Sequence, residues 1–174
     1  MSHSTHNKEI SMSKWSPNAQ LASLQFSGIV SFIIALQFLH FIGLNIIDAI
    51  SPSHPILQSF VFENFKFVPL ILGGFFLLRY IFTLKQLNTA TNWHSVLMIL
   101  KDEYALSIYR VAASKSFTTT ISLCFVLFYI TVLEMGPPAM TALLNAETVL
   151  ATLIFISSVV FGCIVLFHLH DEDA

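Results

Sequence analysis

Residues 92 to 125 have the sequence NWHSVLMILKDEYALSIYRVAASKSFTTTISLCF. The stretch begins with polar residues around Trp93 and carries charged side chains as far as Lys115. From Ser116 onward it has no charged residue, and charged side chains are costly to place in lipid. The sequence therefore predicts one element that runs from a wetted surface into a membrane.

The composition of the whole chain supports this interpretation. Of its 174 residues, 55% are hydrophobic and 10% are charged, whereas soluble domains carry about 25% charged residues. The mean hydropathy of +0.75 indicates lipid as the solvent for most of the chain. The formal net charge of -2 gives no reason to expect nucleic acid as a partner. Cys124 and Cys163 both lie in apolar runs, so neither a disulfide nor a metal pair is predicted.

Four segments with little or no charge are long enough to cross a bilayer, for which about 20 helical residues suffice. The predicted spans cover residues 21–47, 67–84, 112–133 and 148–167. We therefore predict an all-α fold, an integral membrane bundle of four transmembrane helices. The predicted parts of the chain are a mobile N-terminal segment at 1–20, the membrane domain at 21–168 and an acidic tail at 169–174.

Apolar residues between the second and third spans recur at spacings of three and four. This pattern is typical of an amphipathic helix at a membrane surface. The residues are Trp93, Leu97, Leu100, Tyr104, Ile108 and Val111. We expect this amphipathic helix to lie on the cytoplasmic side and to lead into the third span.

Small residues in two of the spans predict close helix packing, because they let helix backbones approach one another. Gly73 and Gly74 follow Pro69 in the second span, where they permit either a kink or a close approach. Ser158 and Gly162 stand four residues apart in the fourth span.

Residues 101 to 122, KDEYALSIYRVAASKSFTTTIS, place an acidic pair at the start of a helix, then a basic residue, an alanine pair and a span. In this order they resemble small bacterial and archaeal membrane proteins of uncharacterised function, in which an Asp-Glu-Arg motif precedes a transmembrane helix. The matching positions are Asp102, Glu103, Arg110, Ala112, Ala113 and Phe117, and Tyr104 stands where the third motif residue would be arginine. The resemblance covers about an eighth of the chain and implies a four-span membrane protein rather than a particular chemistry.

The basic residues predict an orientation. Those around the connection between spans two and three, or before span one, are Lys8, Lys14, Arg79, Lys85, Lys101, Arg110 and Lys115. The other two connections offer only Lys66. Because basic residues concentrate on the cytoplasmic side, we expect a multi-pass protein of the inner (plasma) membrane with both termini in the cytoplasm.

The first span carries a polar stripe, whose members fall within roughly 140° of one another at about 100° per residue. They are Gln37, His40, Asn45 and Asp48. Polar groups are costly in lipid, so the stripe is expected to face other helices or water. Two alternative functions follow: His40 could bind haem or a quinone in a redox membrane anchor, or the stripe could serve a small ion or solute carrier.

The sequence contains no motif of a serine hydrolase, zinc protease, P-loop enzyme or dinucleotide-binding enzyme. We therefore predict a non-enzymatic accessory or regulatory protein of the lipid bilayer, without cofactor or metal. It is predicted to act through contacts with another membrane protein or a second copy of itself. The predicted partner-binding residues are Trp93, Leu97, Leu100, Asp102, Glu103, Tyr104, Arg110, Ser116 and Thr120.

Overall fold

The computed structural model describes residues 16–51, 64–87, 100–132 and 144–170. They form the helices α1 (Pro17–Ile50), α3 (Val68–Gln86), α5 (Glu103–Val132) and α7 (Ala146–His170), and a short 3₁₀ helix, η2 (Phe65–Phe67), leads into α3. Among these described residues there is no β-strand. The predicted all-α fold is confirmed.

All four long helices have the length and apolar composition needed to cross a membrane. They coincide with the four predicted spans, and each begins or ends within a few residues of the prediction except α5 at its start. α5 is one continuous helix of 30 residues that begins at Glu103, so it joins the charged segment to the apolar third span without a break.

The start of α1 corrects one predicted boundary. Residues 17–20 were expected in the mobile N-terminal segment, but they form the first turn of α1. Ser16 caps this turn, since its Oγ accepts a hydrogen bond of 3.2 Å from the N–H of Ala19. Pro17 suits the first helical position, where an N–H would have no acceptor.

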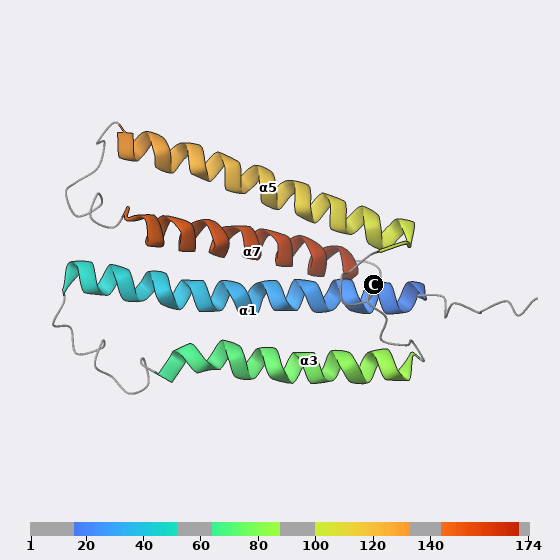
Figure 1. The fold of residues 1–174 in the computed structure, drawn as a ribbon. Helices are drawn as coiled ribbons and strands as arrows, with labels where there is room; N and C mark the ends of the chain where they lie inside the picture. The colour runs from blue at the N-terminus through green and yellow to red at the C-terminus, as the bar shows by residue number, and fades with distance from the viewer. Residues whose placement is uncertain (1–15, 52–63, 88–99, 133–143, 171–174) are drawn as a thin grey trace, which may run out of the picture.

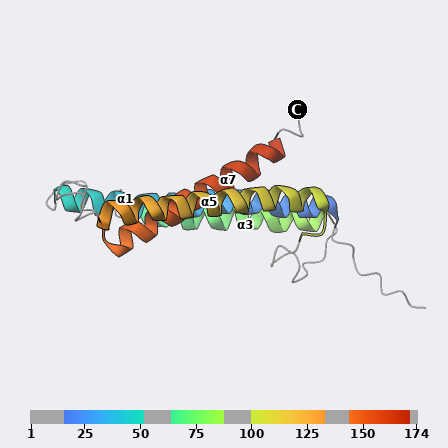
Figure 2. The ribbon, with the colours of Figure 1, turned by 90° about the horizontal axis from the view of Figure 1, so that it is seen from above.

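The helices lie side by side in the order α3, α1, α7, α5, and each is antiparallel to its neighbour (Figure 1). Seen from above, α1, α3 and α5 occupy one thin layer, and the C-terminal end of α7 rises out of it (Figure 2). The two edge helices, α3 and α5, each pack mainly against one other helix. The sequence predicted a bundle but did not say which helices would be neighbours.

α1 and α7 approach each other closely where they cross at a pair of glycines. A Cβ atom on Gly162 would lie 2.9 Å from ring carbons of Phe32 and 3.0 Å from the carbonyl oxygen of Gly28. A Cβ atom on Gly28 would lie 3.0 Å from Cγ1 of Val165. The close packing predicted from Gly162 is therefore confirmed, and Gly28 is its counterpart on α1.

The glycine pair of α3 does not make such a contact. A Cβ atom on Gly74 would meet nothing within 4 Å, and one on Gly73 would only reach a side-chain carbon of Ile33 at 4.0 Å. The sequence permitted a kink or a close approach at these positions, and within the described part of the chain the glycine pair makes no close approach.

Hydroxyl groups hold α5 against α7. The Oγ of Ser116 donates a 2.8 Å hydrogen bond to the carbonyl oxygen of Ser157, and it lies 2.7 Å from the Oγ of the same residue. Ser116 is 6% exposed. In an apolar environment such bonds between helices replace contacts with water that the side chain has lost.

Replacement of Ser116 by alanine is therefore expected to lower the free energy of unfolding by about 0.5–1.5 kcal/mol, the usual net value of such a bond. The measurement is unfolding of the purified protein in mixed detergent micelles. Ser114 is exposed on the same helix, so Ser114→Ala is the control and should change stability by less than about 0.5 kcal/mol. Equal losses from the two variants would contradict the assigned role of Ser116.

Candidate functional site

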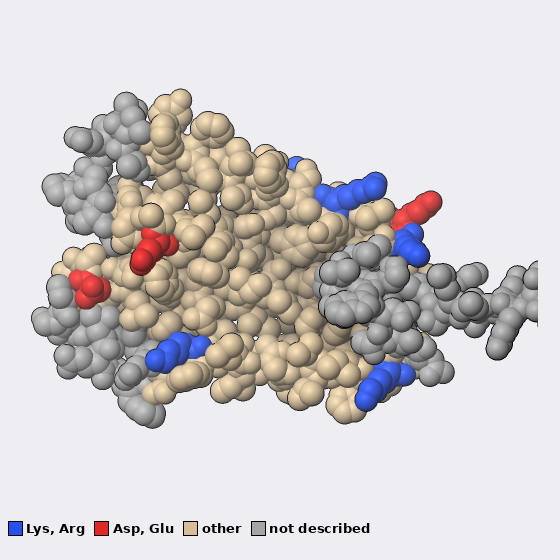
Figure 3. Space-filling model, viewed as in Figure 1, with Lys and Arg blue, Asp and Glu red and all other residues tan. Residues whose placement is uncertain are grey.

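Positively charged side chains gather at one end of the layer (Figure 3), where α1 and α5 begin and α3 and α7 end (Figure 1). We call this the basic end; its described members are Arg79, Lys85, Lys101, Arg110 and Lys115. The opposite end carries Asp48, Glu147 and Lys66. On the face shown in Figure 3, a broad band of uncharged side chains separates the two ends.

Gln20 ties the start of α1 to the start of α5. Its side chain is 2% exposed, and its Oε1 accepts hydrogen bonds from the backbone N–H groups of Lys101 at 2.5 Å and Asp102 at 2.7 Å. Both residues precede α5, so their N–H groups have no acceptor within that helix. One amide oxygen therefore fixes the position at which α5 enters the layer.

Asp102 caps α5. Its Oδ2 accepts a 3.0 Å hydrogen bond from the N–H of Ala105, and a carboxylate at a helix start also interacts favourably with the helix dipole. Leu100, Lys101 and Asp102 are not helical. The predicted amphipathic helix therefore does not run unbroken through these residues, and Trp93 and Leu97 lie outside the described part of the chain.

A small apolar core lies next to the hydrogen bonds made by Gln20. Its members come from α1, α5, α7 and the residue before the cap: Leu24, Leu100, Ala105, Ile108, Ala112 and Val165. Ala105 and Ala112 are 0% exposed, and their small side chains let α5 approach the other helices closely. Ala112, the first member of the alanine pair, therefore lies in a close contact between helices.

Two of the predicted partner-binding residues are used inside the chain instead. Leu100 is 8% exposed and belongs to the apolar core, and Ser116 is bonded to Ser157. Their assignment to a partner surface is corrected, because α7 already covers that side of α5. Of the remaining described residues in the prediction, Glu103, Tyr104 and Arg110 are exposed, and Asp102 and Thr120 are half-buried.

The outward side of α5 carries hydroxyl residues that the prediction omitted. Ser107, Ser114 and Thr118 are exposed, and at about 100° per residue they lie within about 40° of one another. We call these three residues the outer α5 face. The hydroxyls of Ser107 and Thr118 donate to carbonyl oxygens of their own helix, at 2.7 and 2.9 Å. Sequence alone could not separate them from Ser116, since both groups are small and polar.

The predicted polar stripe of α1 is divided between two neighbours. The Nδ2 of Asn45 donates a 3.1 Å hydrogen bond to Thr148 of α7, whereas His40 is 9% exposed and its ring lies 5.2 Å from that of Phe65 beside α3. Gln37 is half-buried and Asp48 is exposed. The four residues therefore do not share one environment.

The described histidines also lie far apart. His168 and His170 end α7 at the basic end, close to the level of Leu24 in α1, and His40 is 16 residues farther along α1. At ~1.5 Å of rise per residue the separation is about 24 Å. Among the described residues, no three His, Cys, Asp or Glu side chains come together as a metal site would require.

α1 and α3 meet at a tyrosine. The hydroxyls of Tyr80 and Ser23 are 2.6 Å apart, and the ring of Tyr80 stacks on that of Phe26 with centroids 4.4 Å apart and planes 5° apart. A groove lies beside this contact, and the side chain of Arg79 is one of its walls.

Comparison with known proteins adds no functional information, since no protein-family model, no curated protein and no solved structure matches this chain.

Proposed function

We propose that the protein is a non-enzymatic integral membrane protein that acts by lateral contact with another membrane protein, through the outer α5 face. The four helices cross the bilayer, and the basic end lies in the cytoplasm together with both termini. The proposal assigns the protein an accessory or regulatory role in a membrane assembly.

The distribution of charge supports this placement in the membrane. The tan band in Figure 3 separates two charged ends, as expected of a protein whose middle lies in hydrocarbon. Among the described residues, the basic end holds five Lys and Arg side chains, whereas the opposite end holds Lys66. Basic residues near spans favour the cytoplasmic side, and the antiparallel helices bring Arg79 of α3 and Arg110 of α5 to that same side.

The outer α5 face is the observation that carries the proposal for a protein partner. α5 packs mainly on α7, and the side opposite that contact presents Ser107, Ser114 and Thr118. A lipid-facing surface gains nothing from small hydroxyl residues, whereas a second helix can approach them closely. The hydroxyls of Ser107 and Thr118 are already bonded to carbonyl oxygens of their own helix, so at these two positions a neighbouring helix can approach without leaving the hydroxyl unsatisfied.

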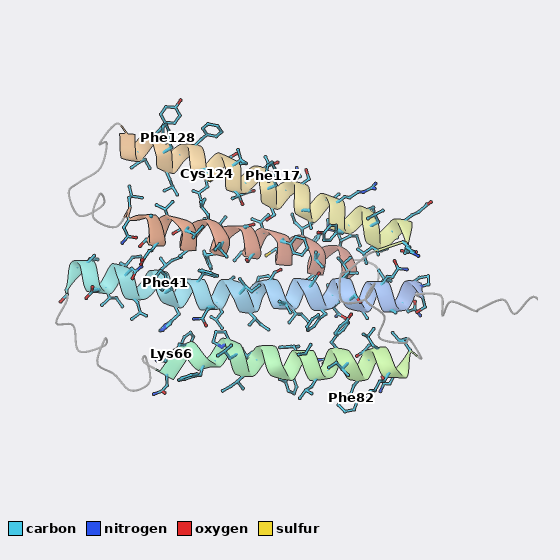
Figure 4. The ribbon with its side chains drawn as sticks, in the orientation of Figure 1. Phe41, Lys66, Phe82, Phe117, Cys124 and Phe128 are labelled. Atoms are coloured by element: carbon cyan, nitrogen blue, oxygen red, sulfur yellow. The ribbon has the colours of Figure 1, made fainter. Side chains whose placement is uncertain are left out.

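The surface beside this face differs in chemistry. Phe117 and Phe128 are 68% and 60% exposed, and in Figure 4 they project from α5 away from α7. Large aromatic side chains of this kind suit lipid acyl chains. On α3, Phe82 likewise points away from α1 and is 63% exposed. The small hydroxyl residues therefore mark a narrow strip on a surface that is otherwise bulky and apolar.

The test is photo-crosslinking from single positions in the native membrane. A photoreactive residue replaces Thr118 on the outer α5 face, and the matched control replaces Leu78, which is 59% exposed on α3. We expect a discrete protein adduct from position 118, either with another protein or with a second copy, and lipid adducts alone from position 78. Lipid adducts alone from position 118, or the same protein adduct from both positions, would refute the proposal.

The haem or quinone anchor and the ion or solute carrier stay predictions of the sequence. A visible absorption spectrum of the gently purified protein tests the first, since a band that disappears in His40→Ala would place a chromophore there.

A further inference from the structure

A shallow, open groove lies between α1 and α3, with a cavity volume of about 40 Å³. Its lining includes Gln25, Phe26 and Ile29 of α1 and Phe76, Arg79 and Tyr80 of α3. This volume is well below the range of about 300–1,000 Å³ for sites that enclose a small molecule. The groove is therefore suited to one extended chain lying along it, with the rest of the molecule outside.

The lining changes from polar to apolar along the groove. α1 runs away from the basic end and α3 runs toward it, so Gln25 and Arg79 lie nearer that end, and Ile29 and Phe76 lie deeper. Thr83 is also at the polar end, and it stands seven positions after Phe76, which corresponds to about 10 Å along the helix. A groove with this gradient matches a molecule with a polar head and an apolar tail.

The charge of the residues that line the groove indicates the charge of the polar headgroup that it would bind. Among the described residues that line it, Arg79 is the one charged side chain and none is acidic. A guanidinium in a partly apolar setting is stabilised by an anion that can accept hydrogen bonds from its planar fork, and phosphate matches that geometry. Gln25 is exposed on the facing helix and supplies an amide N–H₂ as a further donor.

The walls of the groove are held in place independently of any ligand. Tyr80 is fixed by its contact with Ser23 and by the stacked ring of Phe26. Arg79 is the next residue on α3, and its own carbonyl oxygen accepts a 3.0 Å hydrogen bond from Thr83. The groove is therefore a preformed part of the contact between α1 and α3.

We propose that this groove binds one anionic phospholipid of the surrounding bilayer. The lipid phosphate lies against Arg79 and Gln25, and an acyl chain lies along Phe26, Ile29 and Phe76. The basic end is at the level of the lipid headgroups in the proposed orientation, which puts Arg79 within reach of a phosphate. The inference rests on the membrane placement proposed above but not on the outer α5 face, so failure of the crosslinking experiment leaves it intact.

The experiment measures which lipid stays bound to the purified protein. Wild type and variants are equilibrated in micelles with equal amounts of phosphatidylglycerol and phosphatidylcholine, and native mass spectrometry gives the ratio of the two single-lipid adducts. We expect phosphatidylglycerol to predominate on the wild type. Arg79→Gln should reduce the preference about tenfold, the effect of losing one hydrogen-bonded charge pair, whereas Arg110→Gln, at the same end but outside the groove, should change it less than about twofold.

A second variant tests the place of the acyl chain. Ile29→Trp fills the apolar part of the groove and leaves Arg79 unchanged, so it should reduce retention of both lipids. Helical content and unfolding temperature, measured without added lipid, establish that each variant is folded. If the Arg79→Gln variant is not folded, Arg79→Lys is used in its place. It should reduce the preference for phosphatidylglycerol several-fold, because lysine keeps the positive charge but lacks the planar guanidinium that can donate two parallel hydrogen bonds.

Two results would overturn the proposal. An unchanged lipid ratio in the folded Arg79 variant would show that this residue does not hold the headgroup. Equal reductions in the Arg79→Gln and Arg110→Gln variants would show that anionic lipid gathers around the basic end as a whole, without a site in the groove.

Discussion

Gly162→Ala should lower the free energy of unfolding by about 1–3 kcal/mol, the usual cost of overpacking a tight contact, and Gly162→Leu should lower it further. The reason is geometric. The added Cβ would lie 2.9 Å from ring carbons of Phe32 and 3.0 Å from the carbonyl oxygen of Gly28. The ring can rotate or shift, but the backbone oxygen moves only if α1 and α7 separate along the crossing.

The same chain supplies a close control. Gly74 is also in a long apolar helix, and a Cβ there would meet nothing within 4 Å. Gly74→Ala should therefore leave stability unchanged or raise it by up to about 1 kcal/mol, because alanine favours helix over glycine. Unfolding of the three variants in mixed micelles measures both effects. Similar losses from Gly162→Ala and Gly74→Ala would mean that the α1–α7 crossing is not the tight contact described above.

Gln20→Leu is expected to have an effect of comparable size. Leucine has a similar volume but no acceptor, so the N–H groups of Lys101 and Asp102 would both lose the oxygen that they share. A buried donor left unsatisfied costs about 1–3 kcal/mol, and because these two bonds are partly buried, the pair costs at most about 2–6 kcal/mol. The measurements are unfolding in micelles and amide hydrogen exchange, which should accelerate at residues 101 and 102 before it does in the middle of α5.

Two further variants separate the hydrogen bonds from a general effect of the substitution. Gln86→Leu makes the same change at an exposed position of α3, outside the groove, and should cost less than about 0.5 kcal/mol. Gln20→Glu retains acceptor oxygens and should be better tolerated than Gln20→Leu. If leucine at position 20 behaves like leucine at position 86, then Gln20 does not hold the start of α5.

These contacts explain how a thin layer of helices is held together. The centre of the layer is the α1–α7 crossing, where two glycines remove the side chains that would keep the helices apart. α5 is held at its start by Gln20 and farther along by Ser116. α3 has the contact of Tyr80 with Ser23 and Phe26 at one end, and the groove opens beside it.

The two edge helices of the layer offer different kinds of surface. α5 uses one side for α7, so its other side is available to whatever surrounds the protein, whereas the groove opens where α3 meets α1. The outer α5 face is small and polar, whereas the groove beside α3 combines one cation with aromatic walls. A protein partner is therefore proposed at the outer α5 face, and a phospholipid in the groove beside α3.

The candidate sites were only partly predictable, because exposure depends on neighbours. Arg110 and Glu103 are charged, and a charged side chain stays at the surface whichever helix lies nearby. Ser116 and Ser114 are the same residue type two positions apart, yet one is bonded to α7 and the other is exposed. Nothing local distinguishes them until the position of α7 is known.

By itself, the sequence determined the helical fold and the approximate limits of the four apolar helices. Length and hydropathy suffice for that, because each helix satisfies its own backbone hydrogen bonds. Only the tertiary structure decided that α1 lies between α3 and α7, that Gly162 rather than Gly74 makes the close contact, and that Gln20 holds the start of α5. Those outcomes depend on which surfaces fit together across the chain, and a Gly or Gln has the same local preferences whether or not a partner lies opposite it.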